Sequence, residues 1–382
     1  LSLLTYEPTG ALIAAPTTSL PEAIGGVRNW DYRYTWLRDS AYILYALQSI
    51  GHHVAAGGFF GWLERLCLDR VSDLQIMYTI DGGADLTEQV LDHLEGYRGS
   101  RPVRIGNAAS GQRQLDIYGD VLDAAYLHLR EQPDAISPGL MRTLGTLADL
   151  AATRWREPDQ GIWEVRGGPQ HFLYSKLFCW VALDRAIHLT GDVGLTGNVA
   201  AWRRERDLIR RTILSEGYDR ELGAFTQALG QPVLDAAALA IPMVGFLPAT
   251  DPRVQSTIDQ IMRQLSTDGL VYRYRTDDGL PDSEAACVLC SFWLVDTLAH
   301  SGRLDEARAI FEKVAGYAND VGLLAEEVDP STGELLGNHP QGFSHLALIQ
   351  AALGIARSDE HGAEARAQTM AQRWYQAPSD SR

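Results

Sequence analysis

Residues 291–314 read SFWLVDTLAHSGRLDEARAIFEKV and contain two helical patterns of different character. In 291–299, apolar and small residues fall on nearly every side of a helix, whereas in 304–314 charged and apolar residues alternate at helical spacing. A helix that is apolar all round is buried, and an amphipathic helix covers it. A break at Gly302 separates the two patterns. The stretch therefore predicts a hairpin made of one inner and one outer helix.

The same alternation recurs along the chain, in runs separated by short Gly, Pro or Asp breaks. We predict about twelve helices in six hairpins, which is an all-α fold of the (α/α)6 barrel type. The predicted helices cover residues 33–50, 52–69, 112–130, 138–154, 173–190, 193–214, 234–246, 251–266, 282–301, 303–317, 339–354 and 359–373. Short β-like stretches at 223–229 and 270–275 are expected to form hairpins or loops at the rim.

Composition limits the partners of the chain. It has 382 residues, is 46% hydrophobic and carries a formal charge of −16, which makes nucleic acid an unlikely partner because phosphate binding needs clustered Lys and Arg. No apolar run is long enough to span a membrane. We expect a small neutral substrate, with the oligomeric state left open.

The four cysteines, Cys67, Cys179, Cys287 and Cys290, lie in apolar helical patterns and are expected to be buried free thiols. Such thiols indicate a reducing compartment. The chain starts at Leu1 without a basic or cleavable leader, so the sequence predicts a cytoplasmic protein.

Residues 29–40, NWDYRYTWLRDS, place two Trp, two Tyr, two Arg and two Asp immediately before an apolar helical run. Aromatic rings offer flat faces to the C–H face of a sugar ring, and an Arg-Asp pair can bond to adjacent hydroxyls. Simple packing at the start of a helix is the alternative, because Trp and Tyr often lie in cores.

Polar, aromatic and Gly-rich segments precede the predicted inner helices. They cover residues 29–39, 107–119, 161–176, 271–284 and 324–344. If the inner helices run parallel to one another, these segments meet at one end of the barrel. The sequence therefore predicts a pocket built there from residues that lie far apart in the chain.

Two of these segments carry carboxylates in unusual surroundings. Glu164 follows Trp163, and the Glu326-Glu327 pair follows an apolar Leu-Leu-Ala run where an unpaired carboxylate is costly. Paired carboxylates across a sugar are what acetal hydrolysis requires, one as proton donor and one to activate water. Solvated surface acids are the alternative reading. Successive residues of an extended loop point opposite ways, so only one of Glu326 and Glu327 can face the pocket.

Three motifs together resemble glycoside hydrolase family 15, the group of glucoamylases, glucodextranases and trehalases. They are YRYTWLRDS at 32–40, GIWE at 161–164, and AEE at 325–327 followed by the FSH of the next helix. With the six-hairpin pattern, the resemblance covers nearly the whole chain. It implies an (α/α)6 barrel and hydrolysis of α-glucosides with inversion and release of β-glucose. No cofactor or metal is expected, because the His and Cys residues lack the spacing of metal ligands.

The resemblance also implies roles for individual residues. Glu164 matches the general acid and Glu326 the general base. The other matches are to substrate-binding residues, with Arg38 and Asp39 gripping the terminal glucose, Tyr32 placing the attacking water, Trp36 and Trp163 lining the pocket, and Arg273 near the scissile bond.

Bacterial members of the family generally carry a β-sandwich domain before the barrel, whereas here only about twenty-five residues precede the first motif. Residues 1–382 are therefore expected to form a single catalytic domain, with 1–28 leading into it and 374–382 as a frayed tail, unless an amino-terminal part is missing.

The short leading segment and the lack of a visible starch-binding module favour a short substrate. Isomaltose or an isomalto-oligosaccharide is expected first, trehalose second and an α-1,4-linked maltodextrin third. Readings from other classes are an inverting disaccharide phosphorylase and a non-catalytic glucan-binding protein.

Overall fold

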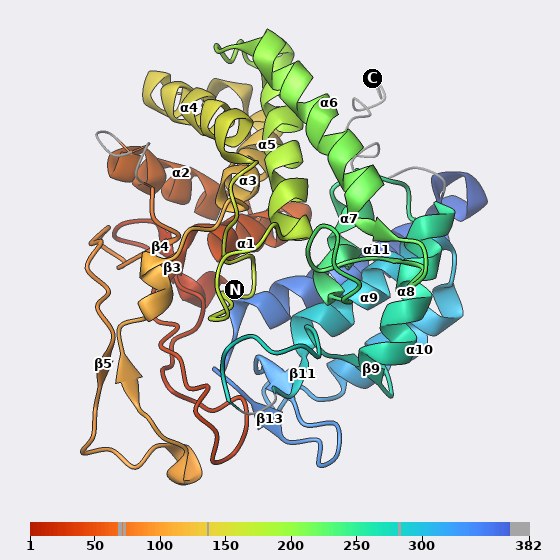
Figure 1. Ribbon diagram of the computed structural model, residues 1–382. Helices are drawn as coiled ribbons and strands as arrows, with labels where there is room; N and C mark the ends of the chain where they lie inside the picture. The colour runs from red at the N-terminus through yellow and green to blue at the C-terminus, as the bar shows by residue number, and fades with distance from the viewer. Residues whose placement is uncertain (68–70, 72–73, 136, 282–283, 367–382) are drawn as a thin grey trace.

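A closed ring of helices forms the centre of the computed structural model, which describes residues 1–382 except 68–70, 72–73, 136, 282–283 and 367–382. The ring consists of α1 (Leu37–Ser49), α3 (Ile117–Glu131), α5 (Leu173–Asp192), η6 (Ala236–Leu239) with α7 (Ala240–Met243), α9 (Val288–Ser301) and α11 (Gly342–Arg366). Each contacts the next in chain order, and α11 returns to pack on α1. The expected inner ring of an (α/α)6 barrel is confirmed (Figure 1).

Five further helices cover this ring from outside. They are α2 (Val54–Cys67), α4 (Pro138–Arg154), α6 (Val199–Glu216), α8 (Pro252–Gln264) and α10 (Leu304–Ala315). The predicted alternation is clear in α9 and α10, because every residue of α9 except Ser301 is buried, whereas α10 buries only Ala307 and Val314. Burial of the apolar stripes between the two layers is the main stabilising contribution.

Several predicted helices differ from the structure, and those predicted at 33–50, 112–130, 193–214 and 282–301 begin four to six residues later than expected. The segment 234–246 forms only the short η6 and α7, and Gly245 follows with a left-handed φ of 76°. The predicted break before 359 is wrong, because α11 continues without interruption to Arg366. Residues 367–373 of the expected last helix lie outside the described residues.

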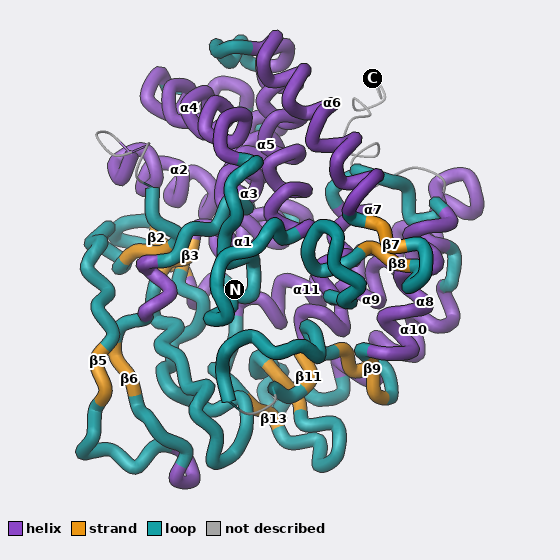
Figure 2. The backbone as a smooth tube through the Cα atoms, viewed as in Figure 1, coloured by secondary structure: helices purple, strands orange, loops and turns teal. Residues whose placement is uncertain are grey.

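Short paired strands join the loops at one end of the ring (Figure 2). A five-stranded antiparallel sheet has the order β13 (Leu335–Leu336), β12 (Glu327–Val328), β11 (Ala286–Cys287), β10 (Leu270–Val271), β9 (Ser266–Thr267). The two-stranded pairs are β1 (Thr5–Tyr6) with β2 (Ala11–Leu12), β3 (Thr35–Trp36) with β4 (Met77–Tyr78), β5 (Gln89–Val90) with β6 (Arg104–Ile105), and β7 (Tyr218–Asp219) with β8 (Ala224–Phe225). The 223–229 and 270–275 stretches are thus hairpin strands, as predicted.

Inner and outer helices begin differently. The outer helices α4, α6 and α8 have side-chain N-caps, from Ser137, Asn198 and Asp251. The inner helices α1 and α9 instead follow directly on extended residues of β3 and β11, without a side-chain cap. Strand pairing therefore fixes the loops from which these inner helices start, and those loops form the site described next. None of the described helices is long and apolar enough to cross a membrane.

Candidate active site

A cavity of about 790 Å³, partly open to solvent, lies where the inner helices begin. All the residues predicted for the site line it, namely Tyr32, Trp36, Arg38, Asp39, Trp163, Glu164, Arg273 and Glu326. They come from four of the five polar segments, and Asn107 of the fifth segment also lines the cavity. The predicted convergence of distant segments is therefore correct.

Glu164 lies in a tight turn after α4. Its φ of 59° is in the left-handed region, which is costly for a residue with a side chain and is often found at functional sites. The Trp36 Nε1 donates to Glu164 Oε1 at 2.8 Å, and an Arg38 Nη2 lies 3.3 Å from the same oxygen. Among the described residues no donor contacts Oε2, so this oxygen is available to a molecule in the cavity.

Arg38 is held in place by buried partners in the segment just before α3. It donates to Gln114 Oε1 at 2.7 Å and contacts Asp116 Oδ2 at 3.4 Å. Asp39 lies beside it, with Oδ2 at 3.7 Å from Arg38 Nε. Burial raises the pKa of Asp39 to about 7, and Arg38 opposes that rise. The pair presents both a cation and a carboxyl to the cavity, a suitable arrangement for binding adjacent hydroxyls.

Glu326 is 2% exposed and lines the cavity. Tyr32 OH donates to its Oε1 at 2.8 Å, and Arg273 Nη2 donates to the same oxygen at 2.6 Å. Oε2 receives only a long bond from the Asn338 amide at 3.4 Å. Burial raises the pKa of Glu326 above its ordinary value, while Arg273 and Tyr32 lower it. Oε2 is therefore the oxygen that can accept a proton from the cavity.

Two aromatic residues in contact with each other link the surroundings of Glu164 and Glu326. Tyr32 and Trp36 meet edge to face with ring centres 5.6 Å apart, so the donor to Glu326 packs against the donor to Glu164. Trp163 donates from Nε1 to Asp235 at 2.8 Å, and the Arg273 guanidinium lies 5.6 Å from its ring centre. Two carboxyls in one cavity, each with one oxygen bonded and one available, can give a proton to a bound molecule and take one from it.

Glu327 does not line the cavity. It is fully buried, and it accepts from Arg273 Nη1 at 2.5 Å and from the Ala285 amide at 3.0 Å. The prediction that only one of the adjacent glutamates faces the pocket is consistent with this arrangement, with Glu326 as the pocket-facing member.

Sequence reasoning missed a group of charged residues around Arg273. Glu22 and Glu284 line the cavity, and so does Arg28, which contacts Glu284 at 3.0 Å and Asp278 at 2.7 Å. Burial and the neighbouring Glu326 raise the pKa of Glu22 well above its ordinary value. These residues carry no local pattern in the sequence, because their partners are far away in the chain. Nothing in the leading segment 1–28 indicated that Glu22 belongs to the site.

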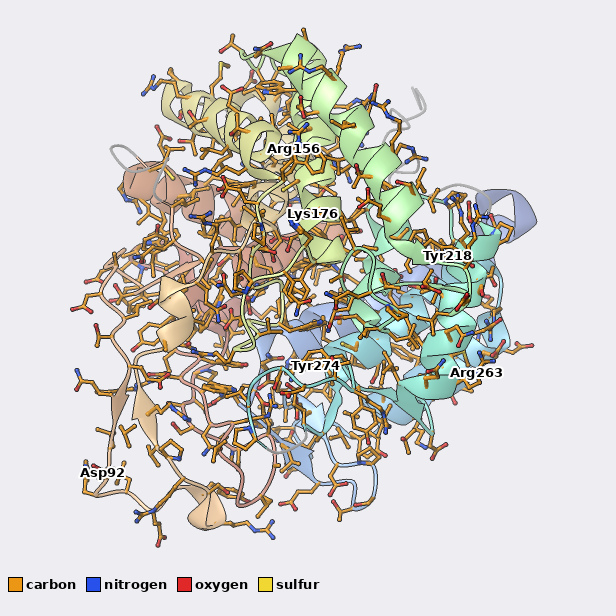
Figure 3. All side chains as sticks on the ribbon, in the orientation of Figure 1. Asp92, Arg156, Lys176, Tyr218, Arg263 and Tyr274 are labelled. Carbon is orange, nitrogen blue, oxygen red and sulfur yellow. The ribbon has the colours of Figure 1, made fainter. Side chains whose placement is uncertain are left out.

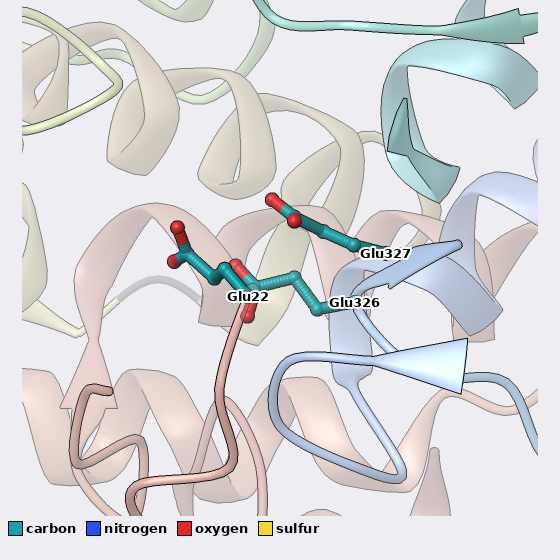
Figure 4. A group of neighbouring side chains, drawn as sticks. All are labelled: Glu22, Glu326 and Glu327. Carbon is teal, nitrogen blue, oxygen red and sulfur yellow. The ribbon is translucent and has the colours of Figure 1, made fainter. Parts of the chain in front are cut away.

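The carboxyls of Glu22, Glu326 and Glu327 lie close together (Figure 4). One oxygen from each lies within 4.8 Å of the others, which is a grouping that could hold a cation. However, Arg273 already donates to Glu326 and Glu327, so a guanidinium supplies the positive charge that such a group needs. Tyr274 is the residue after Arg273 and is labelled in Figure 3. Its OH donates to Asp278 Oδ2 at 2.8 Å.

Comparison with known sequences gives the same family from a family model and from individual relatives. A family model described as glycosyl hydrolases family 15 matches residues 1–353. A trehalase of Mycolicibacterium smegmatis is 47% identical over 366 residues, which is 94% of this chain and 54% of that protein. A trehalase of Thermoplasma volcanium is 41% identical over 354 residues, which is 92% of this chain and 56% of that protein. The chain thus spans about half the length of these curated relatives.

Comparison with solved structures supports the fold. A structure titled "Glycosidase Wild Type" has a TM-score of 0.73 at 21% identity, covering 93% of this chain and 94% of that one. A bacterial glucoamylase complexed with acarbose has a TM-score of 0.70 at 16% identity, covering 97% of this chain and 55% of that one. At these identities the likeness concerns the barrel architecture alone.

Proposed function

The chain belongs to glycosyl hydrolases family 15, and from that premise we propose that it cleaves a short α-glucoside with inversion, using Glu164 as acid and Glu326 as base. The observation that carries the proposal is the pair of carboxyls in one cavity, each bonded through Oε1 only, apart from the long amide contact of Glu326.

In the proposed reaction, Glu164 gives its proton to the glycosidic oxygen as the bond from that oxygen to the anomeric carbon breaks. Water attacks the anomeric carbon from the opposite face, and Glu326 Oε2 takes the proton that the water loses. Inversion requires the carboxyls to stand roughly 6.5–9.5 Å apart, so that both the sugar and the water fit. Arg38 and Asp39 bind the hydroxyls of the terminal glucose, and Tyr32 helps to place the water.

Trehalose is the substrate we propose first. The relatives named trehalase are 41% and 47% identical over more than nine-tenths of this chain. These identities favour trehalose over isomaltose, which the short leading segment had favoured, and over α-1,4-linked maltodextrin. Trehalose has two equivalent glucoses, so either ring can occupy the inner part of the cavity. A panel of trehalose, isomaltose and maltose tests the order, and turnover of isomaltose in preference to trehalose would reverse it.

The phosphorylase reading is less favoured than hydrolysis. The Glu326 loop itself has no Lys or Arg, but the fold brings Arg273 to it. That guanidinium forms ion pairs with Glu284, Glu326 and Glu327. Because these carboxylates neutralise its charge, Arg273 is poorly placed to bind phosphate. Turnover of trehalose in phosphate-free buffer, with no glucose 1-phosphate when phosphate is added, would separate the two activities.

We further propose that residues 1–382 act as one catalytic domain in the cytoplasm. Nearly all the buried apolar residues described form one connected core. All four cysteines are buried and unbridged, a state that suits a reducing compartment.

Glu164→Gln and Glu326→Gln provide the direct test of the two roles. Each substitution keeps the side-chain shape but removes the proton transfer, so kcat is expected to fall by at least about 100-fold. Glu157→Gln, a partly exposed glutamate in the same interhelical loop whose carboxylate pairs with Arg113, serves as the control. Unchanged turnover by either Glu164→Gln or Glu326→Gln would contradict the role assigned to that residue, whereas glucan binding without turnover by the wild-type chain would favour the non-catalytic reading.

A further inference from the structure

A second cavity lies inside the helix ring, farther along the barrel axis than the first. It has about 650 Å³ of free space and is partly open to solvent. Tyr42, Asp120 and Phe178 line it, from α1, α3 and α5, and all three lie past the first residues of their helices. The first cavity instead takes Arg38 and Phe343 from the first turns of α1 and α11.

A layer of aromatic side chains separates the two cavities. Tyr42, which lines the second, packs with its ring centre 6.0 Å from that of Phe343, which lines the first. It also packs against Trp293 at 6.2 Å, and its OH is 2.8 Å from that of Tyr174. The second cavity is therefore a separate space with its own lining.

Asp120 has no partner in this second cavity. Its side chain belongs to a residue that is 2% exposed, yet neither carboxyl oxygen has a hydrogen-bond donor among the described residues. Gln350, on α11 and also lining the cavity, is 5% exposed and its Oε1 is likewise without a donor. Buried polar atoms are almost always bonded in native proteins. Three acceptors in one cavity thus call for a molecule that brings donors.

The charges around the cavity point to a cation. Its one arginine, Arg185, already contacts Asp123 at 2.6 Å and Asp184 at 2.8 Å. Asp120 has no such counter-ion in contact. The remaining walls include the aromatic side chains of Tyr42, Tyr126 and Phe178, and the Tyr126 ring already lies beside the Arg185 guanidinium at 5.9 Å, an example of the attraction of aromatic rings for cations.

We propose that this second cavity binds a small organic cation, with an ammonium group bonded to Asp120 and Gln350 and an apolar body between the aromatic side chains. An ammonium group supplies N–H donors to the three open acceptors and the positive charge that Asp120 lacks. Burial and the neighbouring Asp116 raise the pKa of Asp120 well above its ordinary value, and a cation is the ligand that would stabilise its ionised form. An anion would oppose that form, and a neutral polyol would supply no charge to stabilise it. The site stands on the cavity and its lining, and it does not depend on the reaction proposed for Glu164 and Glu326.

Benzylammonium is a suitable probe because it joins one ammonium group to one aromatic ring. Calorimetric titration at neutral pH should detect binding to the wild-type chain, and benzyl alcohol, the neutral analogue, should bind at least about tenfold more weakly. Saturating glucose, which competes for the first cavity, should not displace the probe. A crystal soaked with benzylammonium should hold it between Tyr42 and Asp120.

Two variants test the lining. Asp120→Asn keeps the shape and removes the charge, and should weaken binding at least about tenfold. Ala124→Leu fills the cavity from α3 and should abolish binding, while Asp134→Asn, an exposed substitution just after the same helix, should change nothing. Thermal melts establish that each variant is folded.

Each contrary result overturns the proposal. Absence of binding at millimolar benzylammonium would mean that water alone supplies the hydrogen-bond donors to Asp120. Equal binding by Asp120→Asn or by benzyl alcohol would remove the cation requirement. Displacement by glucose, or binding unaffected by Ala124→Leu, would place the probe in the first cavity.

Discussion

At the scale of single residues, the balance of charge around Glu326 governs its ability to act as a base. Burial raises the pKa of this carboxyl, and Arg273 is the largest influence that lowers it. The guanidinium is itself buried among Glu284, Glu326 and Glu327, so its charge acts over short distances in a poorly polarisable surrounding. Arg273 therefore keeps Glu326 ionised at pH values where burial alone would protonate it.

Replacing Arg273 with Gln should move the acidic limb of the kcat profile to higher pH. The base works only when ionised, so activity is lost as pH falls through the pKa of Glu326, and removal of the cation raises that pKa. Rates from pH 4 to 9 measure the shift, with Arg263→Gln, an exposed arginine on α8, as control. An acidic limb that stays in place would contradict the role assigned to Glu326.

At the scale of elements, the turn after β13 leaves room for Glu326. Gly337 has a left-handed φ of 72°, and a Cβ added there would lie 2.7 Å from Glu326 Cβ and Oε2. Gly322 also has a left-handed φ, of 78°, but faces open space. The two glycines thus share a backbone requirement, and only Gly337 also makes a close approach to Glu326.

Gly337→Ala and Gly322→Ala should therefore differ in activity more than in stability. Both variants should lose about 1–2 kcal/mol for the left-handed alanine. Only Gly337→Ala should also lose activity, at least about tenfold in kcat, because a displaced base no longer meets the water. Denaturant titration and steady-state rates give the two quantities. Equal kcat values would mean that the position of Glu326 tolerates the shift.

Close packing of α3 on α5 depends on another glycine. A Cβ on Gly119 would lie 2.2 Å from the backbone oxygen of Phe178, whereas one on Gly191, near the end of α5, would meet nothing within 4 Å. Gly119→Ala should destabilise the fold by about 1–3 kcal/mol through overpacking. Gly191→Ala should stabilise it by about 0.5–1 kcal/mol through helix propensity. Urea unfolding compares them, and similar effects would contradict a tight α3–α5 contact.

Sequence patterns predicted that the helices exist more accurately than they predicted the residue at which each helix begins. The apolar periodicity of α9 and α10 indicated both the helices and their layers. The predicted start at 33 lies before that of α1 at Leu37, because Thr35 and Trp36 pair with Met77 and Tyr78 in strands too short to leave a pattern. Local periodicity also could not reveal that α11 continues past 358, because the apolar pattern ends there while the helix runs on to Arg366.

At the scale of the whole molecule, the ring explains which site residues were predictable. Trp163 with Glu164, and the apolar run before Glu326, carry signals in their own neighbours. Glu22 carries none, because its role arises from contact with residues about three hundred positions away. Closure of α11 on α1 packs the last described helix against the first, and the leading segment lies against the Glu326 loop.

Proton NMR of the glucose anomers released from trehalose tests the central claim most directly. Inversion converts one glucose of trehalose to the β-anomer and releases the other as the α-anomer. At early times, before mutarotation, the account predicts equal β- and α-anomer signals from the wild-type chain and neither from Glu164→Gln or Glu326→Gln. Release of α-glucose alone would contradict a water activated by Glu326 on the far face of the sugar.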